Sequence, residues 1–282
     1  MSTTSSQLVR YFTRSNNSRV GVIELNNPSK RNALSLSTLH QLLDIIRKVE
    51  HDGSVRVVLL QAKGPSFSSG HDLSEIRHFQ KEAMEKSKYK EEQSPKEKLN
   101  DLFCVCSDVM TSIIKSTKPY VAKVDGVATA AGCQLVASCD LAYASIGSKF
   151  STPGVNIGLF CSTPAVALCR TVHRKAALDM LLTGRMISAE EAARIGLINE
   201  SVPEQKLEDR VDELTDLIST KSPLAIAEGK PVLATQLDLP LHEAYDLASR
   251  YMVDGALGND CIEGIDAFLS KRNPMWTKDR EK

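Results

Sequence analysis

Short apolar runs alternate with amphipathic segments over roughly the first 200 residues of the chain. Residues 20–25 (VGVIEL) predict a strand that ends at an Asn-Asn-Pro turn, and residues 8–12 predict a strand paired with it as a hairpin. Residues 55–62 (VRVVLLQA) form a continuous run rich in β-branched residues, which is typical of a strand buried on both faces. Two further buried strands are predicted at residues 119–125 and 141–144.

Segments with helical spacing follow these strands. From Ser35 onward, apolar residues recur at intervals of three and four up to Val49, which predicts an amphipathic helix. A short helix is predicted at residues 132–139. Ser188 and Glu191 have the spacing of a capping box and predict the start of another helix.

The recurrence of strand, loop and helix predicts an α/β layered fold. From about residue 163 the chain becomes helical, and helical spacing is clearest in four later segments, residues 207–218, 223–233, 241–257 and 261–269. We therefore predict an α/β core over residues 1–200 and a helical C-terminal region over residues 201–282. A segment rich in Lys and Glu, residues 77–98, predicts a solvent-exposed helix or a flap.

Composition excludes two classes of partner. Apolar residues make up 42% and charged residues 25% of the chain, as in ordinary globular proteins. The 35 Lys and Arg balance the 35 Asp and Glu, so no overall field favours nucleic acid or an anionic membrane. No apolar run approaches the roughly 20 residues that span a bilayer. We expect no nucleic-acid partner and no membrane span, and an anionic ligand would need a local basic cluster.

The cysteines and the N-terminal segment bear on the compartment. The seven cysteines are an odd number without the paired spacing of a zinc site, so we predict reduced core thiols and no metal. Reduced thiols are typical of the cytosol or the mitochondrion. Residues 1–19 are rich in Ser and Thr and contain three Arg and no acidic residue, a composition similar to part of a mitochondrial transit peptide.

Two glycine-containing loops carry the strongest indication of function. They are FSSGHDL, residues 67–73, and DGVATAAGCQL, residues 125–135, and each follows a predicted buried strand. Gly70 permits a tight turn that presents the N–H of His71, and the N–H of Ala131 lies in the first turn of a helix, without an intrahelical partner. Two such donors aimed at one oxygen form an oxyanion hole. Taken singly, each loop is equally typical of a tight connection between strand and helix.

Five motifs in order resemble the crotonase, or enoyl-CoA hydratase/isomerase, superfamily over about residues 20–272: NNPSKRNAL, FSSGHDL, VDGVATAAGCQLVASCDL, TPGVNIGLF and FLSKRNP. The resemblance implies a crotonase (ClpP-like) α/β fold, a spiral of ββα units with a helical C-terminal trimerisation region. It implies a homotrimer or a dimer of trimers in fatty-acid metabolism. The implied location is mitochondrial, with a cytoplasmic one as the alternative. The implied ligand is an acyl-CoA thioester, with no cofactor besides the CoA of the substrate.

The resemblance also implies roles for individual residues. The N–H groups of His71 and Ala131 would hold the thioester carbonyl and stabilise an enolate. The two basic residues of NNPSKRNAL would contact the nucleotide end of CoA, and Phe268 with Lys271 would reach adenine or phosphate across a subunit boundary. The substrate-binding positions implied in this way are Lys30, Arg31, Ser69, Gly70, Asp72, Leu73, Gly132, Cys161, Phe268 and Lys271.

The chain departs from the family at the two positions that carry the glutamates of the usual hydratases. Gln134 stands at the first position and Gly154 at the second. Hydration needs a base for water and a proton for the α-carbon, and neither residue can supply them. We therefore predict that hydration by the usual mechanism is weak or absent.

Three hypotheses remain open on the sequence. The first is a hydratase-like enzyme with a weak or unusual mechanism. The second is a malonyl-type decarboxylase or a thioesterase that uses His71, with Cys161 as a nucleophile that lacks an evident base. The third is a non-catalytic protein that binds acyl-CoA.

Overall fold

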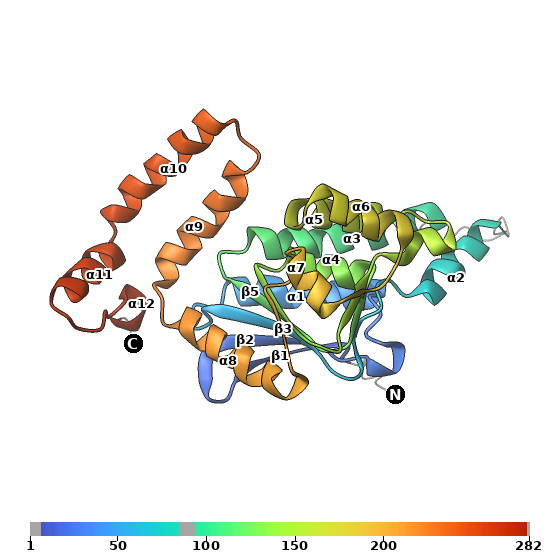
Figure 1. The fold of residues 1–282 in the computed structure, drawn as a ribbon, viewed down its shortest axis with the longest axis horizontal. Coiled ribbons are helices and arrows are strands. Elements are labelled where there is room, and N and C mark those ends of the chain that lie inside the picture. Colours follow the sequence, from blue (N-terminus) through green and yellow to red (C-terminus); the bar gives the residue numbers. More distant parts are fainter. Residues whose placement is uncertain (1–6, 85–93, 281–282) are drawn as a thin grey trace.

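A six-stranded sheet lies at the centre of the protein (Figure 1), in the order β1-β2-β3-β5-β7-β10. The computed structural model describes residues 7–84 and 94–280. The strands from β2 to β10 are parallel, and β1 forms an antiparallel hairpin with β2. The strands of this large sheet are β1 (Val9–Arg14), β2 (Asn17–Leu25), β3 (Val57–Ala62), β5 (Tyr120–Val124), β7 (Leu141–Ser145) and β10 (Glu200–Val202).

A smaller, four-stranded sheet follows the order β4-β6-β8-β9. Its strands are β4 (Ser66–Ser68), β6 (Val127–Thr129), β8 (Lys149–Ser151) and β9 (Ile187–Ser188). Each long strand β3, β5 and β7 is followed by a short strand in this second sheet, and a helix comes next along the chain. The chain therefore winds as a spiral of ββα units, and the predicted crotonase fold class is confirmed.

Helices cover the sheets and form the C-terminal part. They are α1 (Leu36–Glu50), α2 (Leu73–Met84), α3 (Pro95–Lys115), α4 (Ala131–Ser138), α5 (Ser162–Thr171), α6 (Arg174–Thr183), α7 (Ala189–Arg194), α8 (Glu204–Ser219), α9 (Pro223–Gln236), α10 (Leu241–Ala256), α11 (Asn259–Leu269) and α12 (Thr277–Arg280), with 3₁₀ turns η1 (Pro28–Lys30) and η2 (Pro153–Ile157).

The large sheet is buried on both faces, which explains its continuous apolar strands. Val58 and Leu60 of β3 point into the core that α1 and α3 share, whereas Val57 and Leu59 point into a second core with α8. Alternate residues of a strand face opposite sides, so a strand covered on both sides is apolar throughout.

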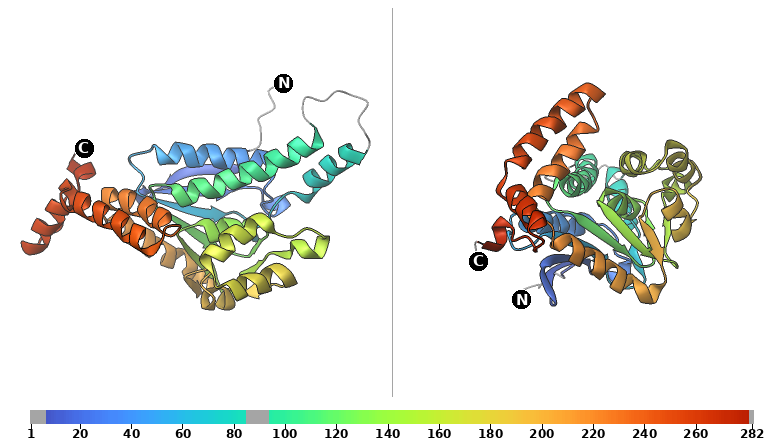
Figure 2. Two further views of the ribbon diagram at one scale, coloured as in Figure 1. Left: turned by 90° about the horizontal axis from the view of Figure 1, so that it is seen from above. Right: turned by 60° about the vertical axis from the view of Figure 1, so that its left-hand side comes forward.

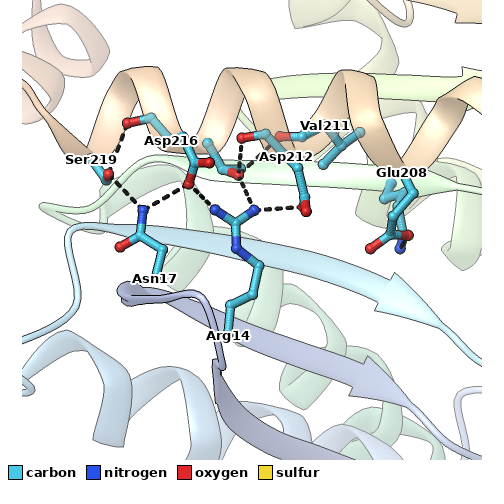
Figure 3. A network of polar contacts seen from close by, with 9 residues as sticks. Arg14, Asn17, Glu208, Val211, Asp212, Asp216 and Ser219 are labelled. Carbon is cyan, nitrogen blue, oxygen red and sulfur yellow. Dashed lines mark hydrogen bonds and ion pairs between the residues drawn. The ribbon is translucent and has the colours of Figure 1, made fainter.

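The helix α8 is attached to the β1–β2 hairpin by a polar network (Figure 3). Arg14 of β1 donates to the carboxylates of Asp212 and Asp216, and Asn17 donates to Asp216 and Ser219. β10 is a strand of the large sheet, and α8 packs on that sheet. The part of the chain that projects from the sheets therefore consists of α9 to α12 (Figure 1). We call this part the C-terminal arm.

The C-terminal arm stands away from the sheets (Figure 2), and large apolar side chains on it are exposed in the single chain. Leu241, Met252 and Leu257 of the α10 region are 75%, 73% and 74% exposed, and Phe268 of α11 is 81% exposed. Large exposed apolar side chains gathered on one part of a folded protein are typical of interaction sites.

Several predictions from the pattern are confirmed by these elements. Ser35 caps α1 by accepting from the N–H of Thr38, and Ser188 caps α7 by accepting from the N–H of Glu191. All seven cysteines are free, but the prediction that they are core thiols holds only for Cys106, Cys133 and Cys161, whereas Cys104 and Cys169 are exposed. Among the described residues, no helix is long and apolar enough to cross a membrane. Residues 1–6 of the segment similar to a transit peptide, and residues 85–93 of the predicted helix or flap, lie outside the described residues.

Candidate functional site

The two glycine-containing loops meet because the strands before them are neighbours. β4 and β6 pair in parallel, with Ser66 opposite Val127 and Ser68 opposite Ala128, so both loops leave the same edge of the small sheet. Gly132 at the start of α4 lies against β4, where an added Cβ would be 2.5 Å from the backbone oxygen of Ser68. Only glycine permits this approach of helix to strand.

Gly70 and Ala131 form the contact between the loops. Gly70 has φ of +81°, and an added Cβ there would lie 2.9 Å from the oxygen of Thr129 and 3.1 Å from the nitrogen of Ala131. Ala130, the N-cap of α4, also has a positive φ of 50°. This strained backbone at the two loop tips is what brings the peptide after Gly70 next to the first peptide of α4.

The N–H groups of His71 and Ala131 are both available to a ligand. Within residues 7–84 and 94–280, neither donates a hydrogen bond to another protein group. The Ala131 N–H also lies at the positive end of a helix that is buried throughout. Two unpaired donors that converge on one carbonyl oxygen would stabilise negative charge on it.

A third segment, residues 27–34, holds the first loop in position. Asn32 is buried and donates from Nδ2 to the oxygens of Lys63 and Ser66, on either side of the start of β4. The N–H of Ser69 donates to the oxygen of Arg31 at 3.0 Å, and the N–H of Leu34 donates to that of Gly70 at 2.8 Å. The basic residues of NNPSKRNAL therefore lie beside the first loop.

Lys30 and Asp72 form an ion pair at this rim, with Nζ 2.9 Å from Oδ2. The hydrogen bond from Lys30 lowers the pKa of Asp72, and Asp72 also accepts from the N–H of Ser74 at the start of α2. Asp72 is therefore an ionised brace of the loop. The Lys30 side chain is 60% exposed, and Arg31 is exposed beside it, so both cations remain accessible to an anion.

The imidazole of His71 is held by its surroundings. Its Nδ1 lies 3.3 Å from the oxygen of Leu34, and the ring packs edge-on against Phe103 of α3 with 5.2 Å between centroids. Because a carbonyl oxygen only accepts, Nδ1 carries the proton, and the lone pair of Nε2 has no partner among residues 7–84 and 94–280. Burial lowers the pKa of His71 below its ordinary value, which favours the neutral ring.

Gln134 is buried in α4, one helical turn after Ala131. It is 4% exposed, and its Oε1 has no hydrogen-bond partner in the part of the chain that the structure describes. An amide cannot exchange a proton near neutral pH, so this position offers hydrogen bonds without acid–base chemistry.

Gly154 is buried in η2 and has no room for a side chain. An added Cβ would lie 2.2 Å from the oxygen of Leu159 and 2.7 Å from Sγ of Cys161. The N–H of Gly154 donates to the same sulfur at 3.3 Å. The segment that follows η2 thus fills the space in which a glutamate side chain would begin.

Cys161 is a buried, protonated thiol. Burial raises its pKa, and the opposing hydrogen bond from Gly154 is smaller in effect. That bond comes from a backbone N–H and not from a base that could remove the proton. A nucleophilic cysteine requires the thiolate, so the surroundings favour a packing role.

The remaining predicted positions divide between two regions. Ser69 is half-buried in the first loop, and Leu73, 56% exposed, begins α2 beside it. Phe268 and the exposed Lys271 lie instead on the C-terminal arm, away from the loops (Figure 1). Phe268 there lines an apolar groove of about 690 Å³ between α9, α10 and α11.

No role was assigned from the sequence to four residues near the site. Ser68 supports the first loop by accepting from the N–H of Gly70, and Leu34 and Phe103 hold the His71 ring. Thr152, fully buried before η2, has an Oγ1 without a partner among the described residues. Three of the four lie within the quoted motifs, but these contacts depend on the folded chain and could not be predicted from the motifs.

Comparison with known proteins agrees with this geometry. The model of the enoyl-CoA hydratase/isomerase family matches residues 15–280. The rat protein named enoyl-CoA hydratase domain-containing protein 3, mitochondrial, is 48% identical over 256 residues, which cover 90% of this chain and 80% of that protein. The human protein of the same name is 45% identical over 255 residues, again 90% and 80% of the two chains. These names support the mitochondrial location.

Two solved structures have the same fold. The crystal structure of human enoyl-CoA hydratase domain-containing protein 3 has a TM-score of 0.86 and 43% identity, covering 95% of this chain and 100% of that one. An enoyl-CoA hydratase from Mycobacterium smegmatis has a TM-score of 0.85 and 39% identity, covering 95% and 98%. With the family match over nearly the whole chain, these similarities show that the protein belongs to the enoyl-CoA hydratase/isomerase, or crotonase, family.

Proposed function

We propose that this protein binds acyl-CoA thioesters, with the thioester carbonyl held between the N–H groups of His71 and Ala131. The observation that supports the proposal is the close approach of the two loops, since a Cβ added at Gly70 would lie 3.1 Å from the Ala131 nitrogen, and among the described residues the N–H groups of His71 and Ala131 have no protein acceptor. Donors of this kind stabilise the enolate oxygen that forms in reactions at the α-carbon of a thioester.

Basic residues near the hole account for the anionic end of the ligand. Lys30 and Arg31 are exposed at the rim and belong to the segment that is hydrogen-bonded to the first loop. The Lys30 ammonium has three donors, so it can contact a phosphate while it pairs with Asp72. Phe268 and Lys271 would contact the nucleotide from the arm of a neighbouring subunit. No cofactor beyond the CoA of the ligand is part of the proposal.

We also propose that hydration of enoyl-CoA is weak or absent. Gln134 cannot act as acid or base, and Gly154 has neither a side chain nor space for one. Positioned acid–base groups contribute roughly 10²–10⁴-fold each, so the loss of both leaves the hole without the groups that activate water.

The other reactions receive less support from the site. A decarboxylase that orients a carboxylate with His71 would need a donor at Nε2, where the neutral ring presents a lone pair. A thioesterase that uses Cys161 would need a base next to its sulfur. The arrangement favours an acyl-CoA-binding protein of lipid metabolism that retains the hole without the acid–base groups of a hydratase.

The exposed apolar side chains of the C-terminal arm support an assembly of several copies. We propose the homotrimer, or dimer of trimers, that the family resemblance implies, with the arm covered by neighbouring subunits. The arm would otherwise expose large apolar residues such as Leu257 and Phe268.

Calorimetry with matched ligands tests the binding proposal directly. Butyryl-CoA and its thioether analogue S-butyl-CoA differ in the carbonyl oxygen that the hole would bind. Two hydrogen bonds are lost in the thioether, so we expect its affinity to be lower by roughly fivefold to a hundredfold. Equal affinities would overturn the proposed hole. If neither ligand binds, the proposed function is overturned.

Mass spectrometry of a mixed panel of acyl-CoAs tests the reaction. Enoyl, malonyl-type and saturated thioesters would be incubated together with the protein. We expect binding without efficient hydration. Rapid loss of the enoyl thioester to its hydrated product would contradict this, and loss of carbon dioxide from the malonyl-type thioester would support the decarboxylase instead.

A further inference from the structure

A lysine of the C-terminal arm reaches into the core at a point where several elements meet. Lys230 of α9 donates from Nζ to the backbone oxygens of Ile113 and Lys118, both at 2.8 Å. The same Nζ lies 2.9 Å from Oδ2 of Asp140 and 5.4 Å from the ring centre of Tyr120. The Lys230 side chain is only 11% exposed, so these bonds to a cation form largely away from water, where they are strong.

The acceptors of Lys230 belong to the C-terminal ends of two helices. Ile113 lies in the last turn of α3, against which α9 packs (Figure 1). Asp140 comes directly after the C-cap of α4, and its Oδ2 also accepts from the N–H of Tyr120 at the start of β5, at 2.7 Å. Lys230 therefore holds the ends of α3 and α4 together on the large sheet.

The other parts of the same two helices shape the proposed oxyanion hole. Ala131, whose N–H is one proposed donor, is the first residue of α4, and the eight residues of this helix span roughly 12 Å. Phe103 of α3 packs against the ring of His71, whose N–H is the other proposed donor. Rigid helices carry a displacement of one end to the other. A shift at the acceptors of Lys230 would therefore reach both donors.

We propose that Lys230 is a positioning residue that couples the C-terminal arm to the oxyanion hole. It acts through α3 and α4 and does not contact the ligand. Docking of the arm then decides how well the two N–H donors converge on the thioester carbonyl. This inference rests on the proposed binding of that carbonyl.

A second attachment of the arm lies away from α3 and α4 and offers a matched comparison. Asp279 of α12 forms ion pairs with Arg19 of β2, at 2.7 Å, and with the buried Arg56. Trp276 donates from Nε1 to the oxygen of Thr220, after α8, at 2.7 Å. These contacts hold the arm to α8 and to the large sheet. A variant that weakens them should loosen the arm without moving the hole.

Calorimetry on the full chain with butyryl-CoA and S-butyl-CoA tests the inference. The ratio of the two affinities reports on the carbonyl alone, because the contacts of the nucleotide end are common to both ligands and cancel. In Lys230→Met, which keeps an unbranched side chain and removes the donor, we expect this ratio to fall by at least about twofold. A purely structural role would lower stability and leave the ratio of the folded protein unchanged.

Two further variants show which contact carries the coupling. Asp140→Asn keeps the shape and removes the charge that pairs with Lys230 at the end of α4, so the ratio should fall, by less than in Lys230→Met. Asp279→Asn weakens the other attachment of the arm and should keep the native ratio.

The outcomes distinguish this inference from the proposed function. A native ratio in Lys230→Met would overturn the coupling and leave the hole intact. An equal loss in Asp279→Asn would also overturn it, because any loosening of the arm would then have the same effect. If Lys230→Met does not fold by circular dichroism, a native ratio in Asp140→Asn would overturn the coupling. Equal binding of the two ligands by the native protein would instead overturn the proposed hole itself.

Discussion

The sulfur of Cys161 accepts a hydrogen bond from the N–H of Gly154 at 3.3 Å, and it lies where a side chain at position 154 would begin. The carbonyl of Leu159 closes the same space from the backbone side. The absence of a glutamate at this position is therefore built into the packing around it. A mutation at position 154 alone would not recover the arrangement of a hydratase.

Gly154→Glu should destabilise the protein instead of restoring hydration. The new Cβ would lie 2.2 Å from a backbone oxygen, so η2 or the Leu159–Cys161 segment must move. Overpacking a buried site typically costs about 1–3 kcal/mol, and a clash with backbone places this variant at the upper end. Urea denaturation measures the loss.

Gly147→Ala is the matched control for this variant, because nothing lies within 4 Å of an added Cβ at position 147. It should leave the free energy of unfolding nearly unchanged. A Gly154→Glu protein with native stability and new hydratase activity would show that the segment after η2 can move freely.

Gly70→Ala should impair recognition of the thioester carbonyl. Its φ of +81° is unfavourable for alanine, and the added methyl would contact Ala130 at 2.8 Å and the Ala131 nitrogen at 3.1 Å. The loop must shift, and the two N–H donors would no longer converge. We expect the preference for butyryl-CoA over S-butyl-CoA to fall severalfold. Gly53→Ala, where an added Cβ meets nothing within 4 Å, should retain it.

The long elements were predictable because each is encoded by local pattern. Residues 57–60 of β3 are all apolar because β3 is covered by α1 and α3 on one face and by α8 on the other. The cap of α1 at Ser35 was evident for the same reason, since it depends on residues close in sequence. The predicted strand at residues 141–144 likewise matches β7, Leu141–Ser145.

The short strands and the site contacts were not predictable in this way. Strands β4, β6 and β8 have only three residues each, too few to show alternation. Pairing of β4 with β6 joins segments about sixty residues apart, and it is this pairing that brings Gly70 to Ala131. The two proposed donors, His71 and Ala131, were predicted from the glycine-containing loops and from the family resemblance. The lack of space at Gly154 was not, because it depends on how the fold brings Leu159 and Cys161 close to it.

Burial of His71 predicts a loss of stability in mild acid. Its pKa in the folded protein is lowered from the ordinary 6.5, so the unfolded chain binds a proton at higher pH than the native chain does. Above the pKa of His71 in the unfolded chain, its neutral form contributes fully to the stability of the folded protein. This contribution is lost as the pH falls from that pKa through the lower pKa of His71 in the folded protein. His71→Gln, which does not titrate, should show a smaller decrease in the urea midpoint between about pH 7.5 and about pH 5.5. Equal decreases in both proteins would contradict the assignment.

Lys230 should be important for docking of the arm. This residue of α9 donates from Nζ to the backbone oxygens of Ile113 and Lys118, both at 2.8 Å, and lies 2.9 Å from the carboxylate of Asp140. Lys230→Met would leave these acceptors without their donor, at a cost of about 3 kcal/mol in the free energy of unfolding. The control Lys206→Met, at an exposed position of α8, should cost little. Comparable stabilities of the two variants would show that Lys230 is not needed to hold α9.

Leu241→Glu should weaken the proposed assembly without unfolding the subunit. Leu241 begins α10 and is 75% exposed in the single chain, so a charge there disturbs no core. If a neighbouring subunit covers the arm, burying a carboxylate in that apolar contact is unfavourable, and the assembly should dissociate at higher protein concentration than the native one. Sedimentation velocity over a dilution series measures the shift, with circular dichroism to confirm folding. Glu243→Gln, exposed on the same helix, should sediment as the native protein does. Identical sedimentation of the native and Leu241→Glu proteins would place the contact between subunits elsewhere on the chain, because a buried charge at position 241 could not be silent.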